Sequence, residues 1–238
     1  MVLGKTIRNW MLNGATEPRN FVRLDHPLLK GLKAGTFKHS HRVGYLAKVA
    51  AKELGLDEAA AWTAGLLHDV GKSVNGNSYI EGETGDRRNS QPIDSAEHLR
   101  IILEHPLYTK NKLIEYGFSQ AVIQAARRHH GTRKFRGELA PEIRSSENDR
   151  YVGPLPQTKL DALLMITDSF EAILNGQLDE RKGNLTEVDI RDLVQSILAK
   201  VWRNLEEENQ LVESDFVFPD LRIVQEAFTF VLLDSYLP

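Results

Sequence analysis

The five residues His68-Asp69-Val70-Gly71-Lys72 carry the strongest signal in the sequence, and they follow an apolar, alanine-rich segment. That segment, residues 58–68, is predicted to be a helix that Asp57 caps at its start. Before it, apolar residues spaced by three and four predict another helix over 39–54, which Gly55 ends. The adjacent histidine and aspartate therefore lie at the end of one of two neighbouring helices.

The remainder of the chain also has the pattern of helices. Asp94-Ser95-Ala96-Glu97 predicts a capping box and a helix to about Glu104, after which Pro106 predicts a break before a helix over 107–116. Further helices are expected over about 119–130, 158–175, 186–205 and 218–237, whereas 69–91 and 132–156 have the composition of loops. Because strand-like alternation is nearly absent, we predict an all-α protein. We expect an N-terminal arm over 1–34 and one compact domain with a C-terminal helical extension over 35–238.

Composition excludes several classes of function. The 238 residues include no cysteine, eight histidines, and 30 basic against 33 acidic side chains, for a formal charge of −3. A disulfide scaffold, a thiolate zinc site and a cysteine nucleophile are therefore excluded. A slightly acidic chain is no general polyanion binder, so we expect no nucleic-acid polymer as a partner. Apolar runs fall far short of the ~20 residues of a membrane helix, and no signal-peptide core is present, so we expect a cytoplasmic protein without membrane contact.

Several histidines and aspartates fall at or near the ends of the predicted helices. Asp168 is the most informative, because it lies inside an apolar helix where an unpaired charge costs several kcal/mol. A hydrogen bond between helices would also explain Asp168, and a histidine pair can simply be a solvated helix end. Together in an all-helical chain these residues form a much more specific pattern, which consists of His39, His68, Asp69, His105, His129, His130 and Asp168.

These residue types predict a metal centre. Imidazole and carboxylate without thiolate suit iron, manganese, nickel or zinc. Seven ligands are too many for one ion but fit two, and the two oxygens of Asp69 could bridge them. Two metals about 3.5–4 Å apart can hold a hydroxide nucleophile and neutralise phosphoryl oxygens. Gly71 would permit a close backbone approach, and Lys72 would place an ammonium group where a phosphate oxygen binds.

The pattern His39…His68-Asp69…Asp168 resembles the HD superfamily of metal-dependent phosphohydrolases. Residues 35–40, His129-His130-Gly131-Thr132 and residues 150–159 resemble more specifically the PgpH-type cyclic-di-AMP phosphodiesterases, the seven-transmembrane HD receptors. The resemblance covers about 35–175 and implies a helical bundle around two divalent metals, often iron or manganese, with nickel, zinc or magnesium as alternatives. It assigns one metal to His39, His68, Asp69 and Asp168, and the other to Asp69, His105, His129 and His130.

The resemblance also implies an activity. A metal-bridging hydroxide would hydrolyse one 3′–5′ phosphodiester of cyclic-di-AMP, with Asp69 and Lys72 as the catalytic residues. The candidate substrate-binding residues are Lys72, Thr132, Arg133, Tyr151, Gln157 and Lys159. Two alternatives stay open: an HD phosphatase or pyrophosphohydrolase of dNTPs, alarmones or nucleoside monophosphates, and a nucleotide-sensing module without turnover. The sequence also leaves open whether the chain forms an oligomer.

The chain departs from the family at two positions. A paired histidine common in the family is Lys38-His39 here, and His41 is a rival candidate, but His39 keeps the family's spacing to His68. After Gly131-Thr132, where the family usually has aromatic residues, this chain has Arg133-Lys134-Phe135-Arg136-Gly137. Aromatic rings are stacking platforms for bases. This change therefore bears on the adenine dinucleotide more than on the hydrolytic chemistry.

Overall fold

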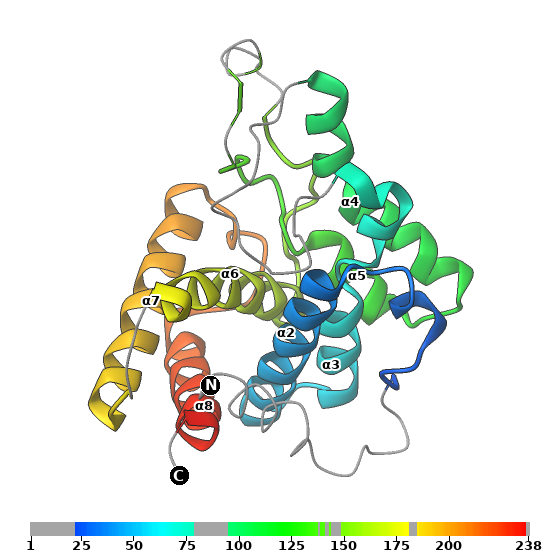
Figure 1. The fold of residues 1–238 in the computed structure, drawn as a ribbon. Coiled ribbons are helices and arrows are strands. Elements are labelled where there is room, and N and C mark those ends of the chain that lie inside the picture. Colours follow the sequence, from blue (N-terminus) through cyan, green and yellow to red (C-terminus); the bar gives the residue numbers. More distant parts are fainter. Residues whose placement is uncertain are drawn as a thin grey trace.

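The computed structural model describes residues 22–78, 95–137, 139–140, 143, 149–180 and 185–236 (Figure 1). These residues form helices without a β-strand, although Lys134 and Arg150 make an isolated β-bridge. The elements are η1 (Pro27–Leu29), α2 (Ala34–Glu53), α3 (Glu58–Leu67), η2 (Val70–Ser78), α4 (Ala96–Glu115), α5 (Gln120–Arg128), α6 (Lys159–Glu180), α7 (Glu187–Glu207) and α8 (Phe218–Tyr236). The predicted all-α class is confirmed. Most of the predicted N-terminal arm, 1–34, lies outside the described residues.

Local capping signals explain where the helices begin. Predicted caps accept hydrogen bonds from the first backbone N–H groups of their helices, which have no partner within the helix. The box predicted at 94–97 differs: Ser95 is the N-cap of α4 and accepts a hydrogen bond from the backbone N–H of His98, while Asp94 lies outside the described residues. The predicted caps that the structure confirms are Asp57, Ser119, Thr158 and Thr186.

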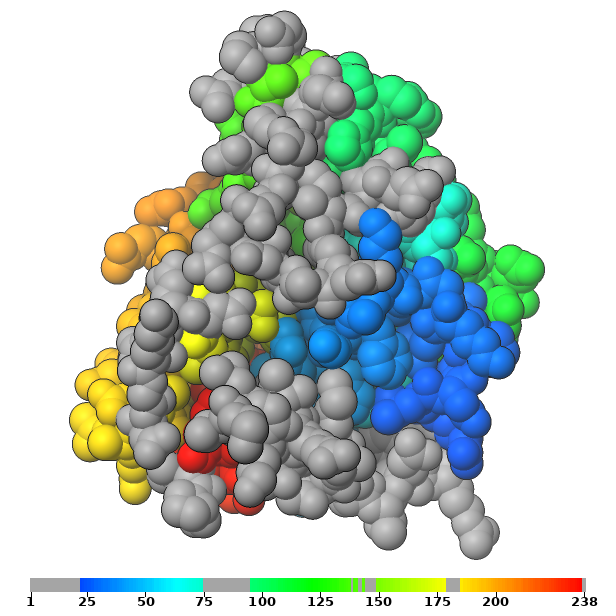
Figure 2. Space-filling model, in the orientation of Figure 1, coloured from blue at the N-terminus to red at the C-terminus, as the bar shows by residue number. Residues whose placement is uncertain are grey.

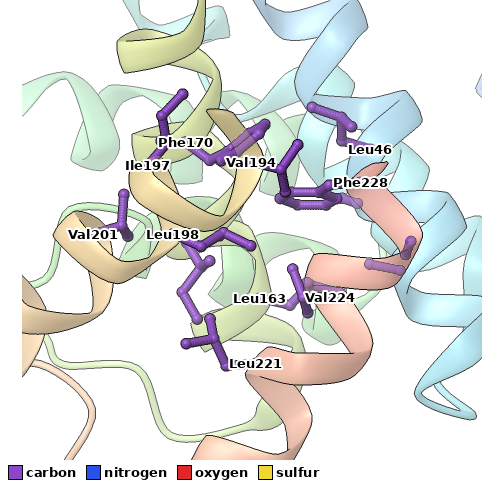
Figure 3. Packing of buried hydrophobic residues seen from close by; sticks show 14 of the residues in the cluster. Leu46, Leu163, Phe170, Val194, Ile197, Leu198, Val201, Leu221, Val224 and Phe228 are labelled. Atoms are coloured by element: carbon purple, nitrogen blue, oxygen red, sulfur yellow. The ribbon is translucent and has the colours of Figure 1, made fainter. Parts of the chain in front are cut away.

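Helix α6 packs against helices from both the earlier and the later part of the chain (Figure 1). It contacts α2, α3, α5 and α7, while α8 contacts α2 and α7. The largest buried cluster lies between α2, α6, α7 and α8, where Leu46, Leu163, Val194 and Phe228 come together (Figure 3). Full burial of one such side chain contributes roughly 1.5–3 kcal/mol. This packing holds α6, and with it Asp168, in a fixed position.

A second apolar cluster packs α2, α3 and α5 together. Val43 of α2, Leu66 and Leu67 of α3 and Ile123 of α5 are buried in it. Figure 2 shows one face of the molecule, on which the blue surface of α2 adjoins the yellow surface formed by later helices. None of the described helices combines the length and the hydropathy that a bilayer-spanning helix needs.

The predicted break at Pro106 is wrong, because α4 continues through this residue. Proline has no N–H, so the carbonyl of Ile102, four residues earlier, loses its usual helical partner. The imidazole of His105 takes the place of that N–H: its Nδ1 donates to the Ile102 carbonyl at 2.7 Å. A side chain therefore compensates for the missing backbone hydrogen bond.

The segment 69–91, predicted as a loop, begins with the short helix η2 (Val70–Ser78). The backbone N–H of Lys72 donates to the carbonyl of Asp69 at 3.0 Å and closes the first turn. The prediction of a loop is therefore wrong for this part, and residues 79–94 lie outside the described residues. Helix η2 contacts α4.

Candidate metal centre

The residues predicted as metal ligands converge from five helices. His39 lies in α2, His105 in α4 and Asp168 in α6. The pairs His68-Asp69 and His129-His130 directly follow α3 and α5. The potential ligand atoms form two groups, with all atoms of a group within 4.8 Å of one another: His39, His68 and Asp69 in one, and His105, His129 and His130 in the other.

Asp69 lies between these two groups. Its Oδ2 is 3.3 Å from Nε2 of His68 and 4.0 Å from Nε2 of His39. Its Oδ1 is 3.1 Å from Nε2 of His105 and 3.8 Å from Nε2 of His129. One buried carboxylate therefore presents one oxygen to each group, which is the arrangement of a bridging ligand.

Asp168 reaches the centre from α6. Its Oδ1 is 3.0 Å from Nε2 of His39 and 3.6 Å from Nε2 of His68. Its Oδ2 is 3.6 Å from Nδ1 of His130. A carboxylate inside an apolar helix is thus explained, because its oxygens face polar nitrogens rather than hydrocarbon.

Three of the histidines have their orientation fixed by a backbone carbonyl three residues earlier. Nδ1 of His68 donates to Gly65, Nδ1 of His105 to Ile102, and Nδ1 of His129 to Ala126, at 2.6–2.7 Å. The carbonyls of Gly65 and Ala126 are available because they belong to the last turns of α3 and α5. In each case Nδ1 carries a proton and Nε2 faces the centre, so Nε2 is the nitrogen that would bind a metal once it holds no proton.

Carboxylates raise the pKa of two of the histidines. Burial lowers the pKa of His68, but Asp69 and Asp168 outweigh burial and raise it to about 10. Burial also lowers the pKa of His39, and there Glu171 and Asp168 raise it to about 9. Both imidazoles are therefore protonated at neutral pH before an ion binds.

The pKa values of His129 and Asp69, in the same centre, are lowered. Burial, together with the neighbouring imidazoles, of which His68 is the first, lowers the pKa of His129 to about 3. Burial raises the pKa of Asp69, but His68 and Lys72 outweigh it and hold that pKa well below its usual range. At neutral pH the carboxylate of Asp69 is thus ionised and the imidazole of His129 is neutral, which are the forms of these groups that bind metals.

Within the part of the chain that the structure describes, two buried atoms of the centre have no hydrogen-bond partner, namely Nε2 of His68 and Oδ1 of Asp69. An unsatisfied buried polar atom is costly, so such atoms need a ligand or an ion. The donors are nitrogen and oxygen only, and oxygen and imidazole donors suit divalent first-row metals. The residues therefore fit two ions, with Asp69 between them.

Residues 36–173 match the HD domain family. The chain belongs to this family. HD domains bind divalent metals, and the two groups around Asp69, which we call the HD centre below, could hold such ions in this protein.

The predicted similarity to PgpH is confirmed by sequence and by structure. The chain is 27% identical over 221 residues to the cyclic-di-AMP phosphodiesterase PgpH of Listeria monocytogenes, covering 89% of this chain and 29% of the relative. PgpH of Bacillus subtilis is 27% identical over 206 residues, covering 83% of this chain and 28% of the relative. The crystal structure of the L. monocytogenes PgpH HD domain in complex with cyclic-di-AMP superposes with a TM-score of 0.72 at 25% identity, covering 90% of this chain and 98% of that chain. The chain spans less than a third of these curated relatives.

The HD centre also contains two residues that are not among the predicted ligands. Glu171 accepts hydrogen bonds from Nδ1 of His39 and from Arg42, and Arg42 also donates to Asn175 at 3.1 Å. Glu171 follows Asp168 by three residues, and Arg42 follows His39 by the same spacing. Residues three apart share a helix face. This spacing, applied to the two predicted ligands, could have identified both residues.

Lys72 and Gly71 bring η2 against the centre. Nζ of Lys72 is 2.7 Å from Oδ2 of Asp69. A Cβ added to Gly71 would lie 2.2 Å from the carbonyl oxygen of His105 and 2.6 Å from the backbone nitrogen of Thr109. The close approach predicted at Gly71 is therefore toward α4, and it is what allows Lys72 to reach Asp69.

Among the predicted substrate-binding residues, Tyr151 and Arg133 also lie beside the centre. The ring of Tyr151 lies 4.1 Å from that of His130, with 31° between the planes. Arg133 donates to Oγ of Ser169, next to Asp168, at 2.6 Å. Thr132 lies in the same loop, directly after the turn that follows His130.

The remaining candidates are not brought to the centre. Gln157 binds Arg128 at 2.7 Å, and Nζ of Lys159 binds Asp220 of α8 at 2.9 Å. These contacts hold the start of α6 and do not reach the ligand groups. His41, the rival of His39, is buried edge-on against Trp62, with ring centroids 5.6 Å apart, away from the ligand groups.

Proposed function

We propose that this chain is a metal-dependent phosphohydrolase that cleaves a nucleotide phosphodiester, with cyclic-di-AMP as the first candidate substrate. The position of Asp69 between the two ligand groups carries the proposal. Two divalent ions at the HD centre would supply a hydroxide nucleophile and neutralise phosphoryl oxygens during in-line attack. We expect iron or manganese, with nickel, zinc and magnesium as the other candidates for a nitrogen and oxygen donor set.

Residues around the ions would bind and orient the substrate. Lys72 places a positive charge beside Asp69 and would contact a phosphate oxygen. Tyr151 covers His130 and offers an aromatic face to a base. Burial raises the pKa of Tyr151, so its hydroxyl stays a neutral hydrogen-bond donor. Thr132 and Arg133 complete this side of the site.

The relatives support this choice of substrate. The curated relatives are described as cyclic-di-AMP phosphodiesterases, and the solved HD domain was crystallised with cyclic-di-AMP. Because the chain spans less than a third of these relatives, the proposal concerns hydrolysis by the matched domain and not the regulation of the longer proteins. We propose that this domain begins near residue 35 and includes α7 and α8.

A substrate panel tests the proposal. Protein loaded with Mn²⁺ or Fe²⁺ is incubated with cyclic-di-AMP, cyclic-di-GMP, dNTPs, alarmones, nucleoside monophosphates and a short RNA, and the products are separated by chromatography. We expect cyclic-di-AMP to give a linear dinucleotide fastest. Faster cleavage of a phosphomonoester or pyrophosphate would favour the nucleotide phosphatase, and binding without turnover would favour the sensing module.

A matched pair of variants tests the role of Asp69. Asp69→Asn should abolish turnover and lower the metal content while the circular dichroism remains that of a helical protein. Asp192→Asn makes the same chemical change at an exposed position of α7 and should leave both unchanged. Full activity in Asp69→Asn would refute the bridging role of this carboxylate.

A further inference from the structure

Arg133 lies beside the HD centre, where its side chain contacts a hydroxyl group. Its guanidinium donates to the hydroxyl of Ser169 at 2.6 Å, and among the described residues it makes no ion pair. Arg42 and Arg128, by contrast, bind Glu171 and a buried aspartate. A partly buried guanidinium with open N–H groups matches the geometry of a phosphate group.

Arg133 and Lys72 approach the centre from different parts of the chain. Lys72 comes from η2 and pairs with Asp69, whereas Arg133 comes from the loop after α5 and lies next to Asp168. The phenol of Tyr151 is influenced by the positive charge of both residues. A phosphorylated ligand bound at the centre would therefore meet two cations that come from different segments of the chain.

The loop that carries Arg133 is held by the turn at the end of α7. Gln210, which is fully buried, accepts a hydrogen bond from the backbone N–H of Thr132 at 2.9 Å and donates to the Thr132 hydroxyl at 3.1 Å. Gly131 has a φ of 52° in the left-handed region, and a Cβ there would lie 2.2 Å from Oε1 of Gln210. A side chain at residue 131 would therefore displace this amide.

Glu208 holds the same loop at Lys134, two residues after Thr132. Its carboxylate accepts a hydrogen bond from the backbone N–H of Lys134 at 2.9 Å and another from Arg136 at 2.6 Å. The backbone N–H groups on both sides of Arg133 are thus bound by the α7 turn. On the other side, the carbonyl of Arg133 accepts from the backbone N–H of Tyr151 at 3.0 Å. The backbone of Arg133 is fixed before any ligand binds.

We propose that Arg133 is a second phosphate-binding cation of this site and that Gln210 positions it from outside the segment that matches the HD family. The inference rests on the proposed function in that it requires a ligand with a phosphoryl group. The proposal also gives a role in ligand binding to the turn that follows α7, which includes Glu208 and Gln210 and lies in the C-terminal extension.

The binding of inorganic phosphate to Mn²⁺-loaded protein, measured by calorimetry, tests the role of Arg133. We expect Arg133→Met to weaken phosphate binding about tenfold or more, with unchanged metal content, because charge-assisted hydrogen bonds are lost. Arg133→Lys should restore part of the affinity. Lys134→Met removes the neighbouring charge, which is exposed, and should change the affinity by less than about twofold. Equal affinities for Arg133→Met and the unaltered protein would overturn the assignment.

A double-mutant cycle tests positioning by Gln210. Gln210→Met should weaken phosphate binding several-fold when Arg133 is present but have little further effect in the Arg133→Met background, because coupled residues are not additive. Gln195→Met makes the same change at an exposed position of α7 and should have no effect. Thr132→Val removes only the hydroxyl and is a milder version, with a smaller loss expected. Losses that simply add would overturn the positioning role.

The two proposals can fail separately. Phosphate binding that depends on Arg133, without turnover of any nucleotide in the panel, would refute the proposed function and leave this inference in place. Turnover of cyclic-di-AMP with unaltered phosphate affinity in Arg133→Met would refute this inference alone.

Discussion

Glu171 accepts a hydrogen bond from Nδ1 of His39, so a carboxylate does for this ligand what a backbone carbonyl does for three other histidines. The difference follows from position. His39 lies inside α2, where carbonyls are occupied by the helical hydrogen bonds. The proton acceptor therefore has to come from another helix, and α6 supplies it one turn after Asp168.

Glu171→Gln should weaken metal binding by the group that contains His39. Glutamine can still accept a hydrogen bond, but it lacks the negative charge that holds the imidazole and balances Arg42. Loss of such a supporting group typically costs about 10–100-fold in metal affinity. Metal titration by calorimetry, with metal content measured by mass spectrometry, should show one weakened site and one unaltered site. Glu187→Gln, on the exposed face of α7, is the control, and identical titrations for the two variants would contradict this role.

Pro106→Ala should weaken metal binding without lowering the stability of the fold. The new N–H at residue 106 would compete with His105 for the carbonyl of Ile102, so the imidazole would be less firmly oriented. A proline inside a helix costs about 3 kcal/mol relative to alanine. Thermal unfolding of the metal-free variant should therefore occur at no lower temperature, while the group that contains His105 binds metal several-fold more weakly. Unchanged metal affinity would show that the proline does not affect His105.

Gly71→Ala should damage both the fold and the centre. The added methyl group would lie 2.2 Å from the carbonyl oxygen of His105, so η2 would have to move away from α4 and take Lys72 with it. Overpacking of this kind costs about 1–3 kcal/mol. Gly176→Ala is the matched control, because a Cβ at that exposed position in α6 meets nothing within 4 Å. It should leave metal binding unchanged, and equal unfolding temperatures for the two variants would contradict the close packing at Gly71.

Metal loading should release protons. The pKa values of about 9 for His39 and about 10 for His68 mean that both imidazoles are protonated at pH 7, and each must lose its proton to bind a metal. His129, with a pKa of about 3, is already neutral and releases none. Metal affinity should therefore rise with pH up to about 9–10 and fall as the pH is lowered. Calorimetry in two buffers of different ionisation enthalpy counts the protons, and the absence of release at pH 7 would contradict the proposed ligands.

The helices and the residues that meet at the HD centre could be predicted because their signals are local. Capping residues, apolar spacing and the ends of helices are visible along the chain, and the family pattern adds the spacing of His39, His68 and Asp168. Pro106 misled the prediction, because a helix tolerates proline when another donor takes the freed carbonyl. That compensation depends on the rotamer of His105, which no local pattern shows.

The residues that support the centre were missed because their roles depend on packing between helices. Glutamate and glutamine are common on exposed surfaces, so neither residue stands out in the sequence. Yet Glu171 contacts α2, and Gln210 holds a loop 78 residues earlier in the chain. The family motif predicts a substrate-binding role for Gln157 and Lys159. Only the three-dimensional arrangement shows that their side chains serve Arg128 and Asp220 instead.

The donors of the HD centre come from five helices, and two of them, His39 and Asp168, are 129 residues apart in the chain. Ions bound there would join these helices much as a cross-link does. A ligand that binds only the folded state, at 100 times its Kd, adds about 2.7 kcal/mol to the free energy of unfolding. Metal supply would then govern the resistance of the protein to proteolysis, and therefore its lifetime in the cell, in addition to its rate of turnover.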